Sequence, residues 1–210
     1  MRRTKEQAEQ TRVAILAAAE QLFLEKGVSH TTLEQIARAA GVTRGAVYWH
    51  FQNKAHLFHA MLDQVRLPPE QLAERLAGCA GADPLWNLRE LCVASIEGLV
   101  QDQQKRRILT ILLHRCEFTD ELREAEERNN AFINAFISMV EDLLKRKDCI
   151  GRLRPGVTPQ VGARSLHALI IGVFTDWTRD ADLVGSQFDV RALFDIQFRG
   201  MVRDWDRPGA

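Results

Sequence analysis

Four neighbouring residues, Arg44, Gly45, Tyr48 and Trp49, have the chemistry to bind a nucleic acid if they lie on one face of a helix. At about 100° per residue they fall within one arc of such a helix, opposite its apolar positions. An arginine can fork onto a guanine edge, a glycine lets the backbone approach a phosphate, and the aromatic residues offer donors beside apolar rings. The alternative is that the two rings pack under a neighbouring domain. The whole arc favours a DNA-binding face.

The residues around this arc extend the predicted interface. His50 and Lys54 follow at the point where the helix should leave the groove and meet the DNA backbone. We expect Arg44 to read a base edge, whereas Tyr48 and Lys54 should contact phosphates. The full set of predicted DNA-binding residues is Thr31, Thr32, Thr43, Arg44, Gly45, Tyr48, Trp49, His50 and Lys54.

Two short helices with a tight turn between them must position this arc. Apolar residues recur at helical spacing before the turn, at Leu33, Ile36, Ala37 and Ala40. Thr32 with Gln35 three residues later fits a capping box. Gly41 stands where the chain must turn, and Thr43 offers an N-cap hydroxyl to the second helix. A turn of about three residues suits a helix-turn-helix, which we predict over residues 33–52.

Residues 31–62 carry a resemblance to a known family. The runs Ala-Gly-Val-Thr-Arg-Gly, Tyr-Trp-His-Phe and Asn-Lys-Ala-His-Leu resemble the DNA-binding signature of the TetR/AcrR family of transcriptional repressors. The run Cys-Glu-Phe-Thr at 116–119 resembles the multidrug-efflux repressors within that family. The resemblance implies an N-terminal three-helix helix-turn-helix domain and a C-terminal helical ligand-binding and dimerisation domain, with about nine helices in all. It also implies a homodimer on a palindromic double-stranded DNA operator, released by a hydrophobic small-molecule inducer.

Two other functions remain open beside repression of an efflux operon. A TetR-type regulator of a metabolic operon could respond to an apolar metabolite. A small-molecule carrier or enzyme could hold an incidental helix-turn-helix, but the chain shows no catalytic motif and no phosphate-binding glycine loop. His56 and His59 are three apart on one predicted helix, with no third metal ligand nearby. We therefore expect no enzyme activity, no cofactor and no metal.

Charge and cysteine usage agree with an intracellular regulator. The net charge is zero, but residues 1–60 hold eight Lys or Arg against five Glu, so basic charge gathers where the helix-turn-helix lies. The cysteines Cys79, Cys92, Cys116 and Cys149 lie far apart, and no signal peptide or membrane-spanning run is evident. We expect a cytoplasmic protein with no membrane partner.

The remaining elements are all helical. Pro68 and Pro69 interrupt the helix capped by Asn53 and place a domain boundary, which divides the chain into residues 1–67 and 68–210. Helical spacing predicts further helices over residues 85–101, 106–115, 120–147, 161–180 and 189–205. No alternation typical of strands occurs, so the fold class is all-α.

The middle helices carry wide apolar stripes, which are more often core than binding site. The family resemblance favours a cavity for hydrophobic ligands, in which a flexible methionine and a few polar groups suit loose recognition. The predicted lining is Leu88, Leu91, Cys92, Ser95, Ile96, Leu109, Leu113, His114, Ile133, Phe136, Met139, Val140, His167, Ile170, Ile171 and Phe174.

The last two long helices have faces that could join two copies of the chain. The first offers Ser165, Ala168, Leu169 and Gly172, with Trp177 as an aromatic anchor. The second offers Leu193, Ile196, Phe198, Met201, Val202 and Trp205. The resemblance implies that these helices pair across a two-fold axis, as reading a palindrome requires. Packing of the same faces within one chain is the alternative.

Overall fold

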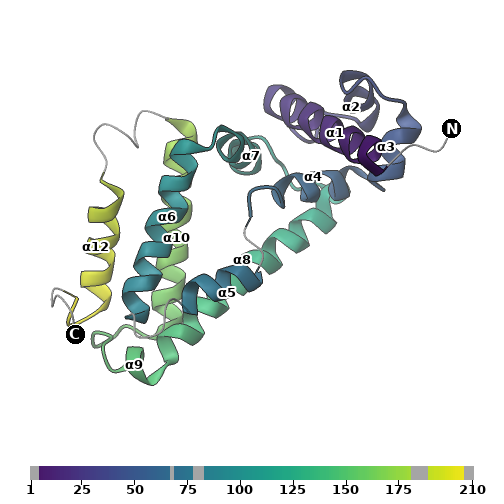
Figure 1. Ribbon diagram of the computed structural model, residues 1–210. Coiled ribbons are helices and arrows are strands. Elements are labelled where there is room, and N and C mark those ends of the chain that lie inside the picture. Colours follow the sequence, from purple (N-terminus) through teal and green to yellow (C-terminus); the bar gives the residue numbers. More distant parts are fainter. Residues whose placement is uncertain (1–4, 67–68, 78–82, 181–188, 206–210) are drawn as a thin grey trace. The chain divides into compact units, whose positions relative to one another are not determined.

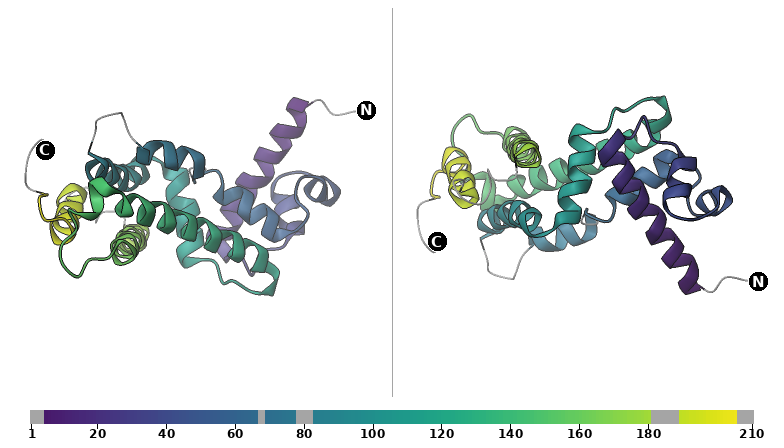
Figure 2. Two further views of the ribbon diagram at one scale, coloured as in Figure 1. Left: turned by 90° about the horizontal axis from the view of Figure 1, so that it is seen from below. Right: turned by 90° about the horizontal axis from the view of Figure 1, so that it is seen from above.

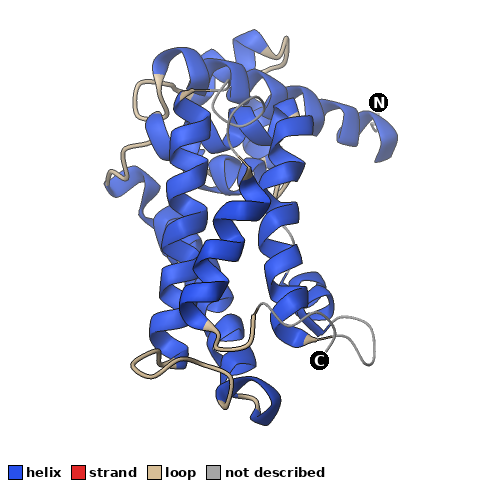
Figure 3. Cartoon of the chain, turned by 90° about the vertical axis from the view of Figure 1, so that its left-hand side faces the viewer, coloured by secondary structure: helices blue, strands red, loops and turns tan. Residues whose placement is uncertain are grey.

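A computed structural model describes residues 5–66, 69–77, 83–180 and 189–205 (Figure 1). Cys79 and Pro68 lie outside these ranges. The described residues form eleven α-helices and one short 3-10 helix, and they contain no strand (Figure 3). A single backbone bridge joins Leu153 and Val202. The all-α prediction is confirmed, and the two helices beyond the nine expected are the short α5 (Pro69–Ala77) and α9 (Lys147–Ile150).

The N-terminal helices are α1 (Lys5–Lys26), α2 (Leu33–Ala39), α3 (Arg44–His50) and α4 (Lys54–Leu62). Their apolar stripes meet in one core that includes Ile15, Phe23, Ile36, Val47 and Phe58, all fully buried. Phe23 and Phe58 meet edge to face, with ring centroids 6.1 Å apart. This packing holds the short helices α2 and α3, which would be too short to persist alone.

Local signals in the sequence set the ends of these helices. Thr32 and Gln35 form both bonds of a capping box at the start of α2. Thr43 and Asn53 cap α3 and α4 by accepting the backbone N–H three residues ahead. Gly41 has φ +66°, a left-handed conformation that favours glycine, and so allows the tight turn. The predicted helix-turn-helix is confirmed in its caps and its turn.

A second part of the chain packs into the same compact unit. This unit comprises residues 1–66 together with residues 104–130, which hold most of α7 (Gln103–His114), the 3-10 helix η1 (Asp120–Leu122) and the start of α8 (Arg123–Lys145). Ile108, Ile111 and Leu122 are fully buried in the N-terminal core. This grouping differs from the boundary drawn at residue 67, because order along the chain cannot show that α7 returns to α1 and α4.

The second compact unit comprises residues 67–103 and 131–210. Within it α6 (Pro84–Gln101) packs against α5, α10 (Pro159–Arg179) and α12 (Val190–Met201). In Figure 2, α10 (light green) and α12 (yellow) are seen almost end-on, while α8 (green) runs across the view. Leu85, Leu88, Val93, Phe194 and Phe198 form part of its buried core. Apolar faces at helical spacing thus build a helical bundle.

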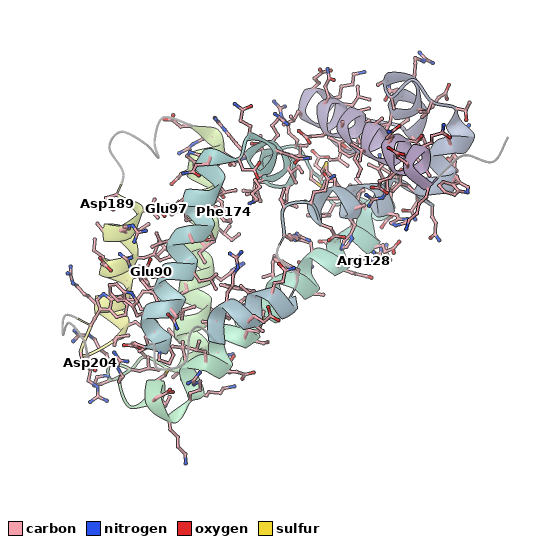
Figure 4. The ribbon with its side chains drawn as sticks, in the orientation of Figure 1. Glu90, Glu97, Arg128, Phe174, Asp189 and Asp204 are labelled. Carbon is pink, nitrogen blue, oxygen red and sulfur yellow. The ribbon has the colours of Figure 1, made fainter. Side chains whose placement is uncertain are left out.

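Ion pairs join α6 to α12 beside this core. Arg89 is buried and donates to a carboxylate oxygen of Asp195 at 3.0 Å and to the Arg191 carbonyl at 3.1 Å. Arg191 in turn pairs with Glu90 and Glu97, which lie on the side of α6 that faces α12 (Figure 4). Because Arg89 has several partners, its burial leaves no charge uncompensated.

A glycine allows a close helix contact within this unit. A Cβ at Gly162 on α10 would lie 2.9 Å from Leu144 Cδ1 and 2.9 Å from Met201 Sδ. By contrast, a Cβ at Gly98 on α6 would meet nothing within 4 Å. Only glycine therefore fits at 162 without displacing a neighbouring side chain.

Candidate functional site

The helix α3 is held by one buried side chain and two half-buried ones, Ala46 and His50, and its other four residues are exposed. Val47 is fully buried, whereas Trp49 is 73% and Tyr48 45% exposed. Arg44 and Gly45 are also exposed. The arc outlined from the sequence is therefore an open surface, and its rings do not pack beneath another element of the described chain.

Arg44 and Tyr48 form a pair on this surface. The Arg44 Nη2 donates to the Tyr48 hydroxyl at 3.4 Å, and the guanidinium carbon lies 5.4 Å from the centre of the Tyr48 ring. The hydrogen bond to Tyr48 raises the pKa of Arg44, so the guanidinium keeps its charge. The pair combines a cation with a ring one helical turn away.

Three further residues of the predicted DNA-binding set surround α3. Thr32 and Thr43 are exposed, and their hydroxyls accept the capping N–H groups of Gln35 and Ala46. His50 is half-buried at the end of α3, with its ring against Trp49 at a centroid distance of 4.5 Å. These residues border the exposed arc.

Two residues of the predicted set are wrongly assigned. Thr31 is fully buried, and its hydroxyl donates to the Gly27 carbonyl at 2.8 Å. Lys54 is only 3% exposed, and its ammonium donates to the Thr31 carbonyl at 3.1 Å and the Ser29 carbonyl at 3.4 Å. It also pairs with Glu121 Oε2 at 2.7 Å. Neither side chain is available to a phosphate.

The contacts of Lys54 form a clamp, by which we mean Lys54 with Ser29, Thr31 and Glu121. The clamp joins the α1–α2 connection to η1, and the Val28 N–H adds a bond of 2.9 Å to the Arg115 carbonyl. Sequence order does not point to Glu121 as a partner, because it lies far from Lys54 along the chain. One signal was present, since a lysine in the first turn of a helix opposes the helix dipole unless it is paired elsewhere.

The predicted ligand-binding residues divide by burial. Leu88, Cys92, Ile96, Val140 and Ile170 are buried core. Burial raises the pKa of the Cys92 thiol to about 12, so this cysteine stays protonated. The half-buried residues are Leu91, Leu109, Leu113, Ile133, Phe136, Met139, His167, Ile171 and Phe174, while Ser95 and His114 are exposed. Half-buried side chains are the ones that a ligand could reach first.

These residues also divide between the compact units. Leu109, Leu113 and His114 belong to α7 in the first unit, and the others lie in the second. Within the second unit, the rings of Phe136 on α8 and His167 on α10 lie 6.4 Å apart. Among the described residues no hydrogen-bond partner reaches the buried His167 Nε2. The side chain thus offers an unused polar atom beside an aromatic ring.

The structure separates core from surface in the last two helices. Trp177, Phe198, Met201 and Val202 are buried within the chain, so the role of Trp177 as an anchor for a second copy is wrong. Trp205 stacks on Trp86, with ring centroids 5.3 Å apart. The residues of these faces that keep exposed or half-exposed surface are Ser165, Ala168, Leu169, Gly172, Leu193, Ile196 and Trp205.

The described parts of the chain contain neither a membrane-spanning helix nor a metal-binding cluster. None of their helices combines the length and apolar character that crossing a membrane requires. No group of three or more His, Cys, Asp or Glu side chains in these parts has the arrangement of a metal site.

Two capped helices, a turn of four residues between them (40–43) and an exposed arc of arginine, tyrosine and tryptophan define a helix-turn-helix DNA-binding protein. Residues 15–61 match the bacterial regulatory proteins of the tetR family, and residues 83–202 match the C-terminal region of MAATS-type transcriptional repressors. The chain belongs to the TetR family of DNA-binding transcriptional repressors and is not an enzyme.

Similar proteins regulate transcription. The chain is 37% identical to the HTH-type transcriptional regulator TtgR of Pseudomonas putida over 195 residues, which is 93% of each protein. It is 64% identical to the crystal structure of native NalD, the secondary repressor of the MexAB-OprM multidrug efflux pump in Pseudomonas aeruginosa, with a TM-score of 0.91 over 94% of this chain and 100% of that one. It is 35% identical to SmeT in a complex with triclosan, with a TM-score of 0.79 over 96% of both chains.

Proposed function

We propose that this repressor controls a multidrug-efflux operon and leaves its operator when a hydrophobic small molecule binds. The exposed arc of α3 is the observation that carries the DNA-binding part of the proposal, because its tryptophan and tyrosine stay largely at the surface instead of joining the core. The choice of operon is supported by two similar structures. NalD is a repressor of a multidrug efflux pump, and SmeT is found in a complex with triclosan. Its place of action would be the cytoplasm, where bacterial DNA lies.

The proposed DNA contacts follow the exposed surface. Arg44 reads a base edge in the major groove, and the Tyr48 hydroxyl contacts a phosphate. Gly45 has no side chain and leaves the backbone open to the duplex. Thr32, Thr43, Trp49 and His50 complete the proposed surface. A second copy presents the same surface to the other half of a palindromic operator.

The proposed ligand site uses half-buried side chains of the middle helices. Phe136, Met139 and Phe174 supply apolar surface, and His167 supplies the polar atom. Residues 1–67 then act as the DNA-binding domain, and residues 68–210 bind ligand and the second copy. Ligand binding shifts α4, which changes the separation of the two α3 helices and lowers operator affinity.

A binding experiment tests this function. The purified protein should select a palindrome from random duplex DNA, and it should bind sites upstream of an efflux operon with the same sequence preference. Triclosan, a hydrophobic phenol, should weaken that binding, and affinity should fall steeply with salt. Selection of a palindrome found only at metabolic operons would redirect the efflux assignment. A protein that selects no sequence would contradict the proposed operator contacts.

A further inference from the structure

The Arg44–Tyr48 pair is a second feature of α3, distinct from its exposure. We infer that Tyr48 is a positioning residue, which holds the Arg44 guanidinium in the orientation that reads a base and so helps to set operator specificity. This inference rests on the base-reading role proposed for Arg44. The sequence by itself predicts that the two residues act independently, one on a base and the other on a phosphate.

The direction of the hydrogen bond leaves the Tyr48 hydroxyl proton available for a second partner. Arg44 Nη2 is the donor and the Tyr48 oxygen is the acceptor, at 3.4 Å, a long bond that adds little energy by itself but shows which group donates. The hydroxyl proton of Tyr48 therefore remains able to donate to a phosphate oxygen. The guanidinium keeps its remaining N–H donors for the edge of a guanine. One tyrosine can thus touch the DNA backbone and hold the arginine at the same time.

The ring supplies a second hold on the arginine. The Arg44 guanidinium carbon lies 5.4 Å from the Tyr48 ring centre, within the range of a cation–π contact. Arg44 and Tyr48 are four residues apart, so the helix itself sets them on adjacent turns. An arginine that is already oriented loses less conformational freedom when it binds a base than one that moves in solvent.

Neighbouring groups leave this pairing unopposed. Glu34 on α2 attracts Arg44, but Arg38 occupies its carboxylate at 3.7 Å on the next turn of that helix. The Trp49 ring packs at 90° against His50 rather than against Arg44. Tyr48 is therefore the group that determines where the guanidinium points.

A double-mutant cycle separates positioning from a simple phosphate contact. The variants are Arg44→Ala, Tyr48→Leu, Tyr48→Phe and the double variant Arg44→Ala with Tyr48→Leu. Each is measured on the duplex selected by the wild-type protein and on duplexes with single base pairs changed. The quantity compared is the ratio of the two dissociation constants, which reports discrimination rather than overall affinity. Both wild-type side chains, Arg44 and Tyr48, are exposed, so the variants should fold.

We expect Arg44→Ala to lower discrimination at one base pair by about tenfold or more. Tyr48→Leu should lower discrimination at that same base pair by about threefold, the size of an exposed cation–π contact. In the Arg44→Ala background Tyr48→Leu should leave discrimination unchanged while it still weakens both duplexes. Tyr48→Phe keeps the ring, so it should lower discrimination less than Tyr48→Leu does.

Trp49→Leu is the matched control on the same helix. It should affect discrimination equally with and without Arg44, because Trp49 does not hold the guanidinium. If Arg44→Ala lowers discrimination but Tyr48→Leu weakens both duplexes equally, Tyr48 is a phosphate contact alone and the inference is wrong. If Arg44→Ala changes discrimination at no base pair, the base-reading role and the inference fall together.

Discussion

Replacing Lys54 by methionine distinguishes the role that the sequence suggested for this residue from the role that the structure shows. Methionine keeps much of the length of the side chain but removes the ammonium. A lysine that contacts DNA phosphate from the surface would be lost at little cost to folding. A lysine that clamps the α1–α2 connection to η1 would be lost at a large cost.

The contacts of Lys54 set the size of this cost. A hydrogen bond from a charged donor contributes about 1.5–3 kcal/mol, which applies to the bond of 3.1 Å to the buried Thr31 carbonyl. The bond to Ser29 is long at 3.4 Å and adds little. Glu121 is 57% exposed, so water screens the ion pair to about 1 kcal/mol or less. We expect Lys54→Met to lower the free energy of unfolding by about 2–4 kcal/mol.

Urea denaturation followed by circular dichroism measures this loss at a fixed protein concentration. Glu121→Gln is the companion variant and should cost about 1 kcal/mol, because the carbonyl contacts of Lys54 remain. Glu127→Gln, on the exposed surface of α8 and outside its first turn, is a control that should cost less than either. DNA affinity is measured over a series of salt concentrations. An unchanged urea midpoint for Lys54→Met, with the slope against log salt reduced by about one, would show that Lys54 is a phosphate contact after all.

Three further predictions test the second unit. Gly162→Ala should destabilise the fold by about 1–3 kcal/mol in urea denaturation, whereas Gly98→Ala should stabilise it by up to about 1 kcal/mol; equal effects would refute the close packing at 162. Burial lowers the pKa of His167 below its ordinary value of 6.5, so the unfolded chain takes up a proton at a higher pH than the folded chain does. The free energy of unfolding should therefore fall as the pH drops below 6.5. His167→Gln should reduce that fall, and an unchanged dependence of stability on pH would contradict this prediction. Ile196 is 65% exposed on α12, on the face proposed to bind the second copy, so Ile196→Asp should yield monomers in analytical ultracentrifugation. Val13→Asp, on the exposed surface of α1, should leave the dimer intact. Dimers of Ile196→Asp would exclude this face of α12 as the dimer interface.

The local parts of the fold could be predicted residue by residue. Caps and turns depend on interactions within about four residues. Residue type and spacing were therefore enough to predict the caps at Thr32 and Asn53 and the turn at Gly41. The exposure of Tyr48 and Trp49 also followed from helical geometry. A helix has a fixed angular period, and Val47 on the apolar side decides which face turns inward.

The sequence by itself determined the all-α class, the helix-turn-helix with its caps, and the arc of α3 that meets solvent. Tertiary structure alone decided that Lys54 is clamped to Glu121 and that Trp177 packs inside its own chain. The physical reason is the range of the interactions. Helical period and capping act between near neighbours, whereas the burial of a charge or a ring depends on residues that only the folded chain brings together.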